Sequence, residues 1–152
     1  ARELRFAAHD GLVIPVRNLQ SQIVALKIRA DGNPASKYLY VSSKKYGGCG
    51  PGASAHVPWN AKEISSRECV LITEGELKAD FRSQSSSVLS ISVPGVGMWS
   101  TALAILNSWR PRRVRLSFDA DAISNPNVGV QFIKCKQELQ LRGFKVEVER
   151  WD

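Results

Sequence analysis

The chain has 152 residues, of which 43% are hydrophobic and 23% charged, so it is long enough to bury one main hydrophobic core. The formal net charge of +7 favours a polyanionic partner such as nucleic acid, with simple solubility as the alternative explanation. The three cysteines are odd in number and lack metal-ligand spacing, which excludes a disulfide framework and a zinc ribbon and favours a reducing, cytoplasmic compartment. No apolar run reaches the ~18 residues of a membrane span, so we expect a soluble protein without a membrane partner.

The first third of the chain has the pattern of β-strands. Three strand-like runs, at residues 12–18, 22–29 and 37–43, are separated by turn-forming residues. Pro15 within the first run indicates an edge strand or a bulge, because proline cannot donate a hydrogen bond to a neighbouring strand. We predict a small antiparallel β-rich subdomain over residues 1–45. A stretch rich in glycine, proline and alanine follows without periodicity, and we predict a connecting loop over residues 46–67.

From residue 68 onward, predicted strands and helices alternate. The strands are expected at 68–73, 88–93, 112–118 and 144–151, and the helices at 76–84, 98–109 and 128–142. Strands joined by single helices require right-handed crossovers, and therefore a mainly parallel four-stranded sheet. One face of the last helix is apolar and is expected to pack on that sheet; it carries Val128, Phe132, Cys135 and Leu139. We predict an α/β domain over residues 68–152, with its functional site at the carboxyl ends of the strands.

Acidic side chains follow two of these strands at the point where each strand ends. Glu74 closes the first strand, and Asp119 and Asp121 come directly after the third. Alternation along an extended segment points the two aspartates the same way, and Gly75 lets the chain turn tightly beside Glu74. Three carboxylates without a nearby histidine suit Mg²⁺ or Mn²⁺, and phosphoryl transfer is the chemistry that such a site serves.

Each acidic residue also has a structural explanation. Glu74 lies near the start of a predicted helix, where a carboxylate interacts favourably with the helix dipole. Asp119 and Asp121 precede an Asn-Pro pair and are typical turn residues. Taken together, a Glu-Gly pair at one strand end and a D-x-D motif at another favour the metal site over these separate explanations.

The run VLITEGELKAD, followed by RLSFDADAIS, resembles the Toprim domain of primases, topoisomerases and related nucleases. The intervening SISVPGVG resembles the strand and glycine turn between the two acidic motifs of primases. The resemblance implies a Toprim (Rossmann-like) fold, in which Glu74 does acid/base work or binds metal and Asp119 and Asp121 bind magnesium. These three residues are the candidate catalytic and metal-binding set.

The segment before the acidic motifs also resembles primases. GLVIPVRN and SKYLYVSS are similar to the strands that precede the Toprim domain of DnaG-type enzymes, whose basic residues face nucleotide and template. That resemblance makes Arg17, Lys27, Arg29 and Lys37 candidate nucleic-acid contacts, although exposed charges on a sheet are the alternative. Lys44 and Lys45 in the glycine-rich stretch are further candidates for binding phosphates. The overall pattern is closest to the Toprim-like domains of plasmid, phage and mobile-element replication proteins.

Lys78 departs from the primase pattern. Primases usually have an acid four residues after the motif glutamate, and a lysine there cannot bind metal. Lys78 is expected to pair with Glu74 or Glu76, or to hold a phosphate as a point charge. Primases often continue after the D-x-D motif with a further acidic residue and a glycine, whereas residues 122–127 here contain neither, so one bound metal is an alternative to two.

Several other site types are excluded or disfavoured. The chain has no P-loop motif, and the glycines at 95 and 97 lack the third glycine of a dinucleotide fingerprint. His9 and His56 have no ligand-spaced partners and are expected to be structurally satisfied or exposed. A cluster of arginines begins the third predicted strand, opposite the carboxylate end, and is interpreted as solvating an edge; it comprises Arg110, Arg112, Arg113 and Arg115.

These features predict a primase-like catalytic core that polymerises nucleotides on a single-stranded DNA template with bound Mg²⁺ or Mn²⁺. The alternatives are a Toprim-type metal-dependent nuclease and a non-catalytic DNA-binding module of a replication protein. The chain starts at Ala1 and stops just after a strand-like run, so we expect a fragment of a longer protein. A helicase or zinc-binding domain is then expected elsewhere in the full-length protein.

Overall fold

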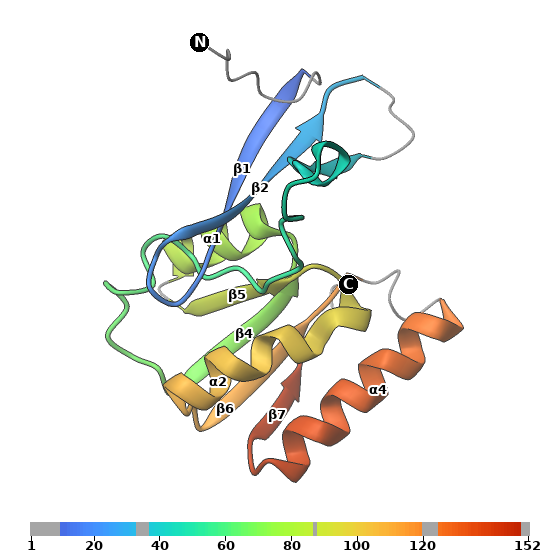
Figure 1. Cartoon of the computed structure of the whole chain (residues 1–152). Coiled ribbons are helices and arrows are strands. Elements are labelled where there is room, and N and C mark those ends of the chain that lie inside the picture. The colour runs from blue at the N-terminus through green and yellow to red at the C-terminus, as the bar shows by residue number, and fades with distance from the viewer. Residues whose placement is uncertain (1–9, 33–36, 87, 120–124, 150–152) are drawn as a thin grey trace.

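The chain forms two β-sheets, of which the second carries the helices (Figure 1). The computed structural model describes residues 10–32, 37–86, 88–119 and 125–149. One sheet has three antiparallel strands in the order β1-β2-β3, and the other has four strands in the order β5-β4-β6-β7. The predicted α/β fold with a small antiparallel β-rich part before it is therefore confirmed.

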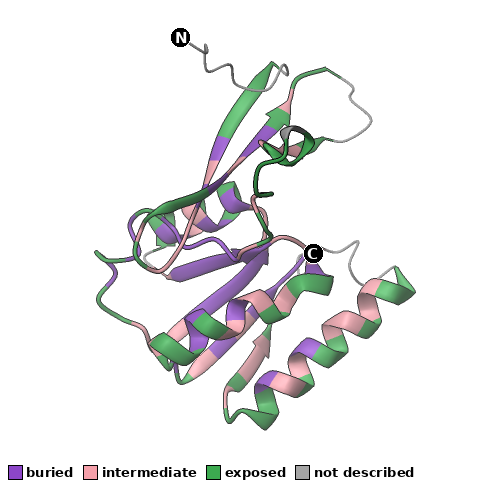
Figure 2. Cartoon of the chain, in the orientation of Figure 1, coloured by how far each residue is buried: buried purple, intermediate pink, exposed green. Residues whose placement is uncertain are grey.

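The antiparallel sheet consists of β1 (Gly11–Arg17), β2 (Ile23–Ala30) and β3 (Tyr38–Tyr40). As Pro15 predicted, β1 is an edge strand, and its register shifts between Val16 and Arg17. The turn into β2 is held by the side chain of Asn18, whose Oδ1 accepts the backbone N–H groups of residues 20 and 22, each at 3.0 Å. The start of β1 and the start of β2 are exposed, whereas buried residues lie further along both strands (Figure 2).

The second sheet is parallel throughout, because every pair of neighbouring strands in it is parallel. Its elements are β4 (Cys69–Glu74), α1 (Glu76–Ser86), β5 (Leu89–Val93), η2 (Val96–Ala102), α2 (Leu103–Trp109), β6 (Arg113–Ser117), α4 (Pro126–Leu141) and β7 (Lys145–Val148). Figure 1 shows α1 on one side of this sheet and α2 with α4 on the other. Strand β5 is buried along its whole length, and the main core lies around it and β4 (Figure 2).

Helix α4 shows how local sequence sets the ends of an element. Its N-terminal cap is Asn125, whose side chain accepts a hydrogen bond from the backbone N–H of Asn127, and Pro126 occupies the first turn. The helix therefore begins two residues before the predicted start. It ends before Gly143, which has a φ of +87°. The predicted apolar face packs against the core: Cys135 and Leu139 are buried, and Val128 and Phe132 are partly buried.

The segment between the two sheets does more than connect them. Lys44–Tyr46 form a short 3-10 helix, η1, and further along Ala55, Val57 and Ile64 belong to the main hydrophobic core. His56 forms an isolated antiparallel bridge to Ser92 of β5. Part of the predicted loop thus covers an edge of the parallel sheet. The segment makes only one isolated bridge, so its sequence lacks the alternation of apolar and polar residues that would predict a strand there.

His56 joins the two sheets through its ring. Its side chain is fully buried, Nδ1 accepts the backbone N–H of Arg17 at 3.1 Å, and Nε2 lies 3.1 Å from Oδ1 of Asp80 in α1. Because Nδ1 accepts a hydrogen bond, Nε2 must carry a proton and donates it to Asp80. The prediction of a structurally satisfied histidine is confirmed for His56, while His9 lies outside the described residues.

Replacing His56 with alanine is expected to lower the free energy of unfolding by about 3 kcal/mol, because the Arg17 N–H loses its buried acceptor and a cavity remains. Urea denaturation measures the change. Glu63→Ala, at an exposed position of the same segment, is the control and is expected to stay within about 0.5 kcal/mol of wild type. A His56 variant as stable as the control would show that the ring does not hold the two sheets together.

Within the described residues, none of the helices has the length and apolar character needed to cross a membrane.

Candidate active site at the carboxyl edge of the parallel sheet

Glu74 and Asp119 lie at the same edge of the parallel sheet. Glu74 is the last residue of β4, and Asp119 comes two residues after the end of β6. The two strands are neighbours, and Thr73 pairs with Ser117. Both acids contribute to one pocket of about 230 Å³, which is lined by Lys27, Tyr38, Glu74, Gly75, Glu76, Lys78, Pro94 and Asp119. The folded chain thus brings two of the three predicted acids together, while Asp121 lies outside the described residues.

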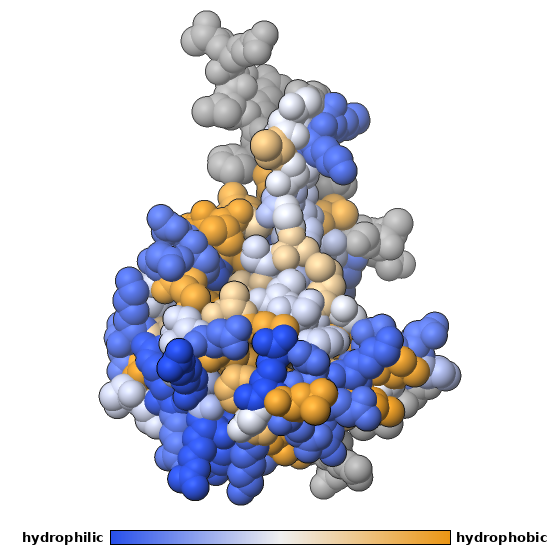
Figure 3. Space-filling view, turned by 60° about the horizontal axis from the view of Figure 1, so that its bottom comes forward, coloured by the Kyte–Doolittle hydropathy of each residue, from blue (hydrophilic) through white to orange (hydrophobic). Residues whose placement is uncertain are grey.

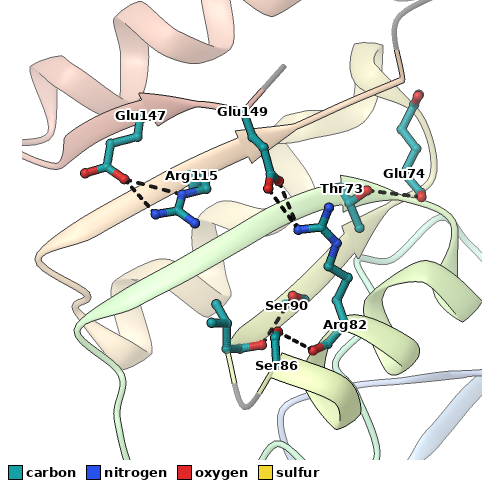
Figure 4. A network of polar contacts seen from close by, with 9 residues as sticks. Thr73, Glu74, Arg82, Ser86, Ser90, Arg115, Glu147 and Glu149 are labelled. Atoms are coloured by element: carbon teal, nitrogen blue, oxygen red, sulfur yellow. Dashed lines mark hydrogen bonds and ion pairs between the residues drawn. The ribbon is translucent and has the colours of Figure 1, made fainter. Parts of the chain in front are cut away.

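Glu74 is held by the turn that follows the neighbouring strand β5. Its Oε1 accepts the backbone N–H of Val96, the first residue of η2, at 2.8 Å. Gly75 has a φ of +85°, a left-handed conformation that lets the chain pass directly from β4 into α1. In Figure 4 the Glu74 carboxylate points away from the ion pairs that cross the sheet. The side chain is therefore fixed through one oxygen at the edge of the pocket.

Asp119 forms an ion pair with Lys78. Both side chains are about half exposed, at 48% and 53% respectively. The predicted pairing of Lys78 with Glu74 or Glu76 is not observed, because its partner is Asp119; phosphate binding by Lys78 stays a prediction. The reason is geometric. Side chains in the first turn of a helix lean back toward its amino end, and the amino end of α1 lines the same pocket as Asp119.

A second lysine reaches the pocket from the antiparallel sheet. Lys27 of β2 forms a buried ion pair with Glu76 of α1, in which the side chains are 9% and 3% exposed. Burial alone lowers the pKa of Lys27, but the hydrogen bond and charge of Glu76, with a smaller effect of Tyr40, outweigh it and raise the pKa above 10.5. The ammonium also lies 4.9 Å from the centre of the Tyr40 ring. This pair joins the two sheets and forms one wall of the pocket.

The other predicted nucleic-acid contacts do not line this pocket. Arg17 lies 3.9 Å from the carboxylate of Asp80, beside His56. The remaining candidates, Arg29, Lys37, Lys44 and Lys45, are exposed residues of the antiparallel part and of η1. They are available to solvent and to a long ligand that extends beyond the pocket.

Sequence reasoning did not identify Tyr38 and Pro94 as pocket residues. Tyr38 begins β3, in the Lys-Tyr-Leu run that resembles primases, and Pro94 follows β5 directly. The sequence contains a feature that could have predicted each of them. Pro94 ends a strand at the carboxyl edge of the sheet, and an aromatic residue beside a basic one is a common feature of nucleotide-binding surfaces.

Two arginine–glutamate contacts brace the sheet away from the pocket (Figure 4). Arg82 of α1 donates to both carboxylate oxygens of Glu149, at 3.1 and 3.0 Å, and Arg115 of β6 donates to Glu147 of β7 at 3.1 Å. The hydrogen bond from Arg115 lowers the pKa of Glu147. Burial by itself raises the pKa of Glu149, but the hydrogen bonds and charge of Arg82, together with the charge of Arg115, lower the pKa below its usual value.

The arginine cluster at the start of β6 is partly neutralised. Arg113 lies 3.6 Å from Glu68 and 3.7 Å from Glu147, and Arg115 is paired as described above. Figure 3 turns the lower side of the molecule, where α2 ends and β6 begins, toward the viewer and shows a mainly hydrophilic surface. These contacts agree with the interpretation that the cluster solvates an edge.

The chemistry of the acids suits a hydrated divalent cation. Glu74 and Asp119 present carboxylate oxygens on one pocket, and Mg²⁺ commonly uses one or two carboxylates together with water and substrate phosphates. The described residues contain no group of three or more acidic, histidine or cysteine side chains that would hold a metal by themselves. Binding at Glu74 and Asp119 would therefore depend on further ligands, and Asp119 would have to release Lys78.

Comparisons with known proteins find the fold but no sequence family. Neither the protein-family models nor the curated proteins give a match. A DNA primase domain from Pseudomonas aeruginosa superimposes with a TM-score of 0.67 and 16% identity, over 90% of this chain and 41% of that one. The Aquifex aeolicus primase, with its zinc-binding and RNA polymerase domains, gives 0.65 and 13%, over 92% and 34%.

A third structure, the DnaG primase catalytic domain bound to single-stranded DNA, gives a TM-score of 0.63 and 16% identity, over 90% of this chain and 43% of that one. At these identities the comparisons establish the fold alone, which this chain shares with part of the primase structures. The chain spans less than half the length of the primase structures that it matches.

Proposed function

We propose that this chain, which has the fold of a primase catalytic core, carries out template-directed nucleotidyl transfer with a divalent metal ion. One observation carries the proposal: Glu74 and Asp119, from neighbouring parallel strands, line a single pocket together with two lysines. Carboxyl ends of parallel strands are where ligands bind in α/β folds, and acids with lysines are the groups that a metal–triphosphate complex requires.

The acids and lysines would have separate tasks. Glu74 and Asp119, with Asp121 added by the Toprim resemblance, would hold Mg²⁺ or Mn²⁺, which would neutralise charge on the transferred phosphoryl group. Glu74 is held by Val96, so its charge is placed before substrate arrives. Lys78 and the amino end of α1 would favour the phosphates of an incoming nucleoside triphosphate. Lys27 is engaged with Glu76 and would position the pocket wall.

Single-stranded DNA is the proposed template. One structural neighbour is a primase catalytic domain bound to single-stranded DNA, and this chain has a formal net charge of +7. The exposed basic residues Arg29 and Lys37 of the antiparallel part, and Lys44 and Lys45 of η1, would contact the phosphate backbone. A cytoplasmic replication protein of a plasmid, phage or other mobile element, with a helicase or zinc-binding domain elsewhere, is the proposed context.

The test is an extension assay on labelled single-stranded DNA with nucleoside triphosphates and Mg²⁺ or Mn²⁺. New products that depend on triphosphate and disappear with chelator support nucleotidyl transfer. Shortening of the labelled strand, without any need for triphosphate, would support the metal-dependent nuclease instead. DNA binding that resists chelation, together with no turnover in this chain and in the full-length protein, would support a non-catalytic module.

The contribution of the lysines in η1 has its own test. The double variant Lys44→Ala, Lys45→Ala is expected to bind single-stranded DNA more weakly, and the slope of log affinity against log salt is expected to fall in magnitude by about 1.4, at ~0.7 for each phosphate contact. Fluorescence anisotropy at several salt concentrations measures it. Arg110→Ala, Arg112→Ala removes the same charge from exposed positions beside the opposite edge of the sheet. Equal slope changes in both variants would mean that η1 makes no particular contact.

A further inference from the structure

The contact between Lys78 and Asp119 places a protein cation on an acid that the proposed function assigns to a metal ion. The pocket is lined by two lysines and three acids, Lys27 and Lys78 against Glu74, Glu76 and Asp119, which gives a formal charge of −1. Each lysine is paired with one acid, so Glu74 carries the remaining charge. The free pocket is therefore close to neutral, a state that does not favour a lone divalent cation.

The two ion pairs differ in how easily they can open. Lys27 and Glu76 are almost completely buried, and opening that pair would leave charges without a partner in a poorly solvated place. Lys78 and Asp119 are about half exposed, and exposed ion pairs contribute little to stability because water replaces each partner. Lys78 is therefore the pocket cation that can change its partner.

Lys78 is also placed where a phosphate would be favoured. It lies in the first turn of α1, whose amino end forms part of the pocket at Gly75 and Glu76. A helix amino end attracts anions, and a lysine has a flexible four-carbon chain with three N–H donors that can be redirected. A triphosphate in this pocket would offer Lys78 a more highly charged partner than one carboxylate.

We propose that Lys78 is an exchangeable counter-ion, an inference that rests on the proposed function. In the free protein Lys78 neutralises Asp119. When a nucleoside triphosphate enters the pocket, the ammonium moves to a phosphate oxygen and releases Asp119 to a divalent cation. Nucleotide and metal then promote each other's binding, and the site takes up little metal in the absence of nucleotide.

The experiment compares two separate titrations of the wild-type chain and of Lys78→Gln. Mn²⁺ alone is followed by the electron paramagnetic resonance signal of the free ion, and ATP alone is followed by calorimetry in the presence of chelator. Lys78→Gln is expected to bind Mn²⁺ about fivefold more tightly, because a competing positive charge is lost. The same variant is expected to bind ATP about tenfold more weakly, because a charged phosphate contact is lost.

Three further variants make the result specific. Lys78→Arg keeps the charge and is expected to return both affinities toward wild type. Lys62→Gln removes the same charge from an exposed position outside the pocket and serves as the control. Adding Asp119→Asn to Lys78→Gln is expected to abolish the gain in Mn²⁺ affinity. Because Lys78 is exposed, unchanged thermal unfolding of Lys78→Gln is expected and shows that the variant folds.

Opposite changes in the two affinities are the signature of exchange. An unchanged Mn²⁺ affinity in Lys78→Gln would make Lys78 a phosphate ligand only, and an unchanged ATP affinity would make it a permanent substitute for a metal; either result overturns the exchange. If wild type binds both Mn²⁺ and ATP and Lys78→Gln binds them with the same affinities, only the proposed role of Lys78 is contradicted. If none of the chains binds Mn²⁺ or ATP, both the role of Lys78 and the proposed metal-dependent function are contradicted.

Discussion

Replacing Lys27 with methionine is expected to lower the free energy of unfolding by about 3 to 5 kcal/mol, the range seen when one partner of a buried ion pair is removed. The side chain of Glu76 is 3% exposed, so its carboxylate would remain in a poorly solvated place without its counter-ion. Loss of the contact with the Tyr40 ring adds to the effect. Urea denaturation of the two chains measures the difference.

The control for Lys27 is the double variant Lys27→Met, Glu76→Leu. It removes both charges, and a buried pair replaced by apolar residues of similar size is often neutral or stabilising. We therefore expect the double variant to recover most of the stability that the single variant loses. A double variant as unstable as Lys27→Met would show that packing, rather than an unpaired charge, causes the loss.

The same pair predicts how stability responds to alkaline pH. The pKa of Lys27 is raised in the folded protein above its ordinary value of 10.5, so the folded state holds this proton more tightly than the unfolded state. The stabilisation is fully present below pH 10.5 and is lost as the pH rises through the raised pKa. Wild type should lose stability above pH 10.5 more steeply than the double variant without the pair.

Replacing Glu74 with glutamine is expected to lower template-directed nucleotide incorporation about a hundredfold or more, equivalent to about 2.7 kcal/mol of transition-state stabilisation. Glutamine has nearly the same shape and keeps an oxygen that can accept the N–H of Val96, now 2.8 Å from Oε1. Stability is therefore expected to change little, and the loss would report the missing negative charge. The extension assay, with unfolding measured in parallel, checks both.

The matched control for Glu74 is Glu63→Gln, which makes the same chemical change at an exposed position outside the pocket. It is expected to leave incorporation unchanged. Wild-type incorporation that persists in Glu74→Gln would remove Glu74 from the catalytic machinery. A large loss of stability in Glu74→Gln would instead assign the residue to holding η2 in place.

Much of the candidate site follows from local sequence. The alternation of strands and helices from residue 68 onward predicts a parallel sheet, and Glu74 and Asp119 follow two of its strands. Because carboxyl ends of parallel strands meet at one edge, their approach to a common pocket is a consequence of that pattern. Pro15 similarly predicts an edge strand, because its missing N–H is a property of the residue itself.

Contacts between distant segments could not be predicted from the sequence in the same way. The ring of His56 was expected to be satisfied or exposed, but its position between Arg17 and Asp80 depends on how a segment without periodicity packs against β5. Residues near it, among them Ala55 and Val57, belong to the core even though their sequence resembles a loop. Burial of such a segment is decided by the surface that it covers, which the segment itself does not encode.

The sequence by itself determined where the strands and the main helices form, that the second sheet is parallel, and at which strand ends the acids Glu74 and Asp119 stand. Only the tertiary structure decided their partners: Lys78 pairs with Asp119, 41 residues away, and Lys27 with Glu76, 49 residues away. Periodicity and residue preference act over a few neighbouring residues, whereas these pairs depend on which strands are adjacent and on how the two sheets meet.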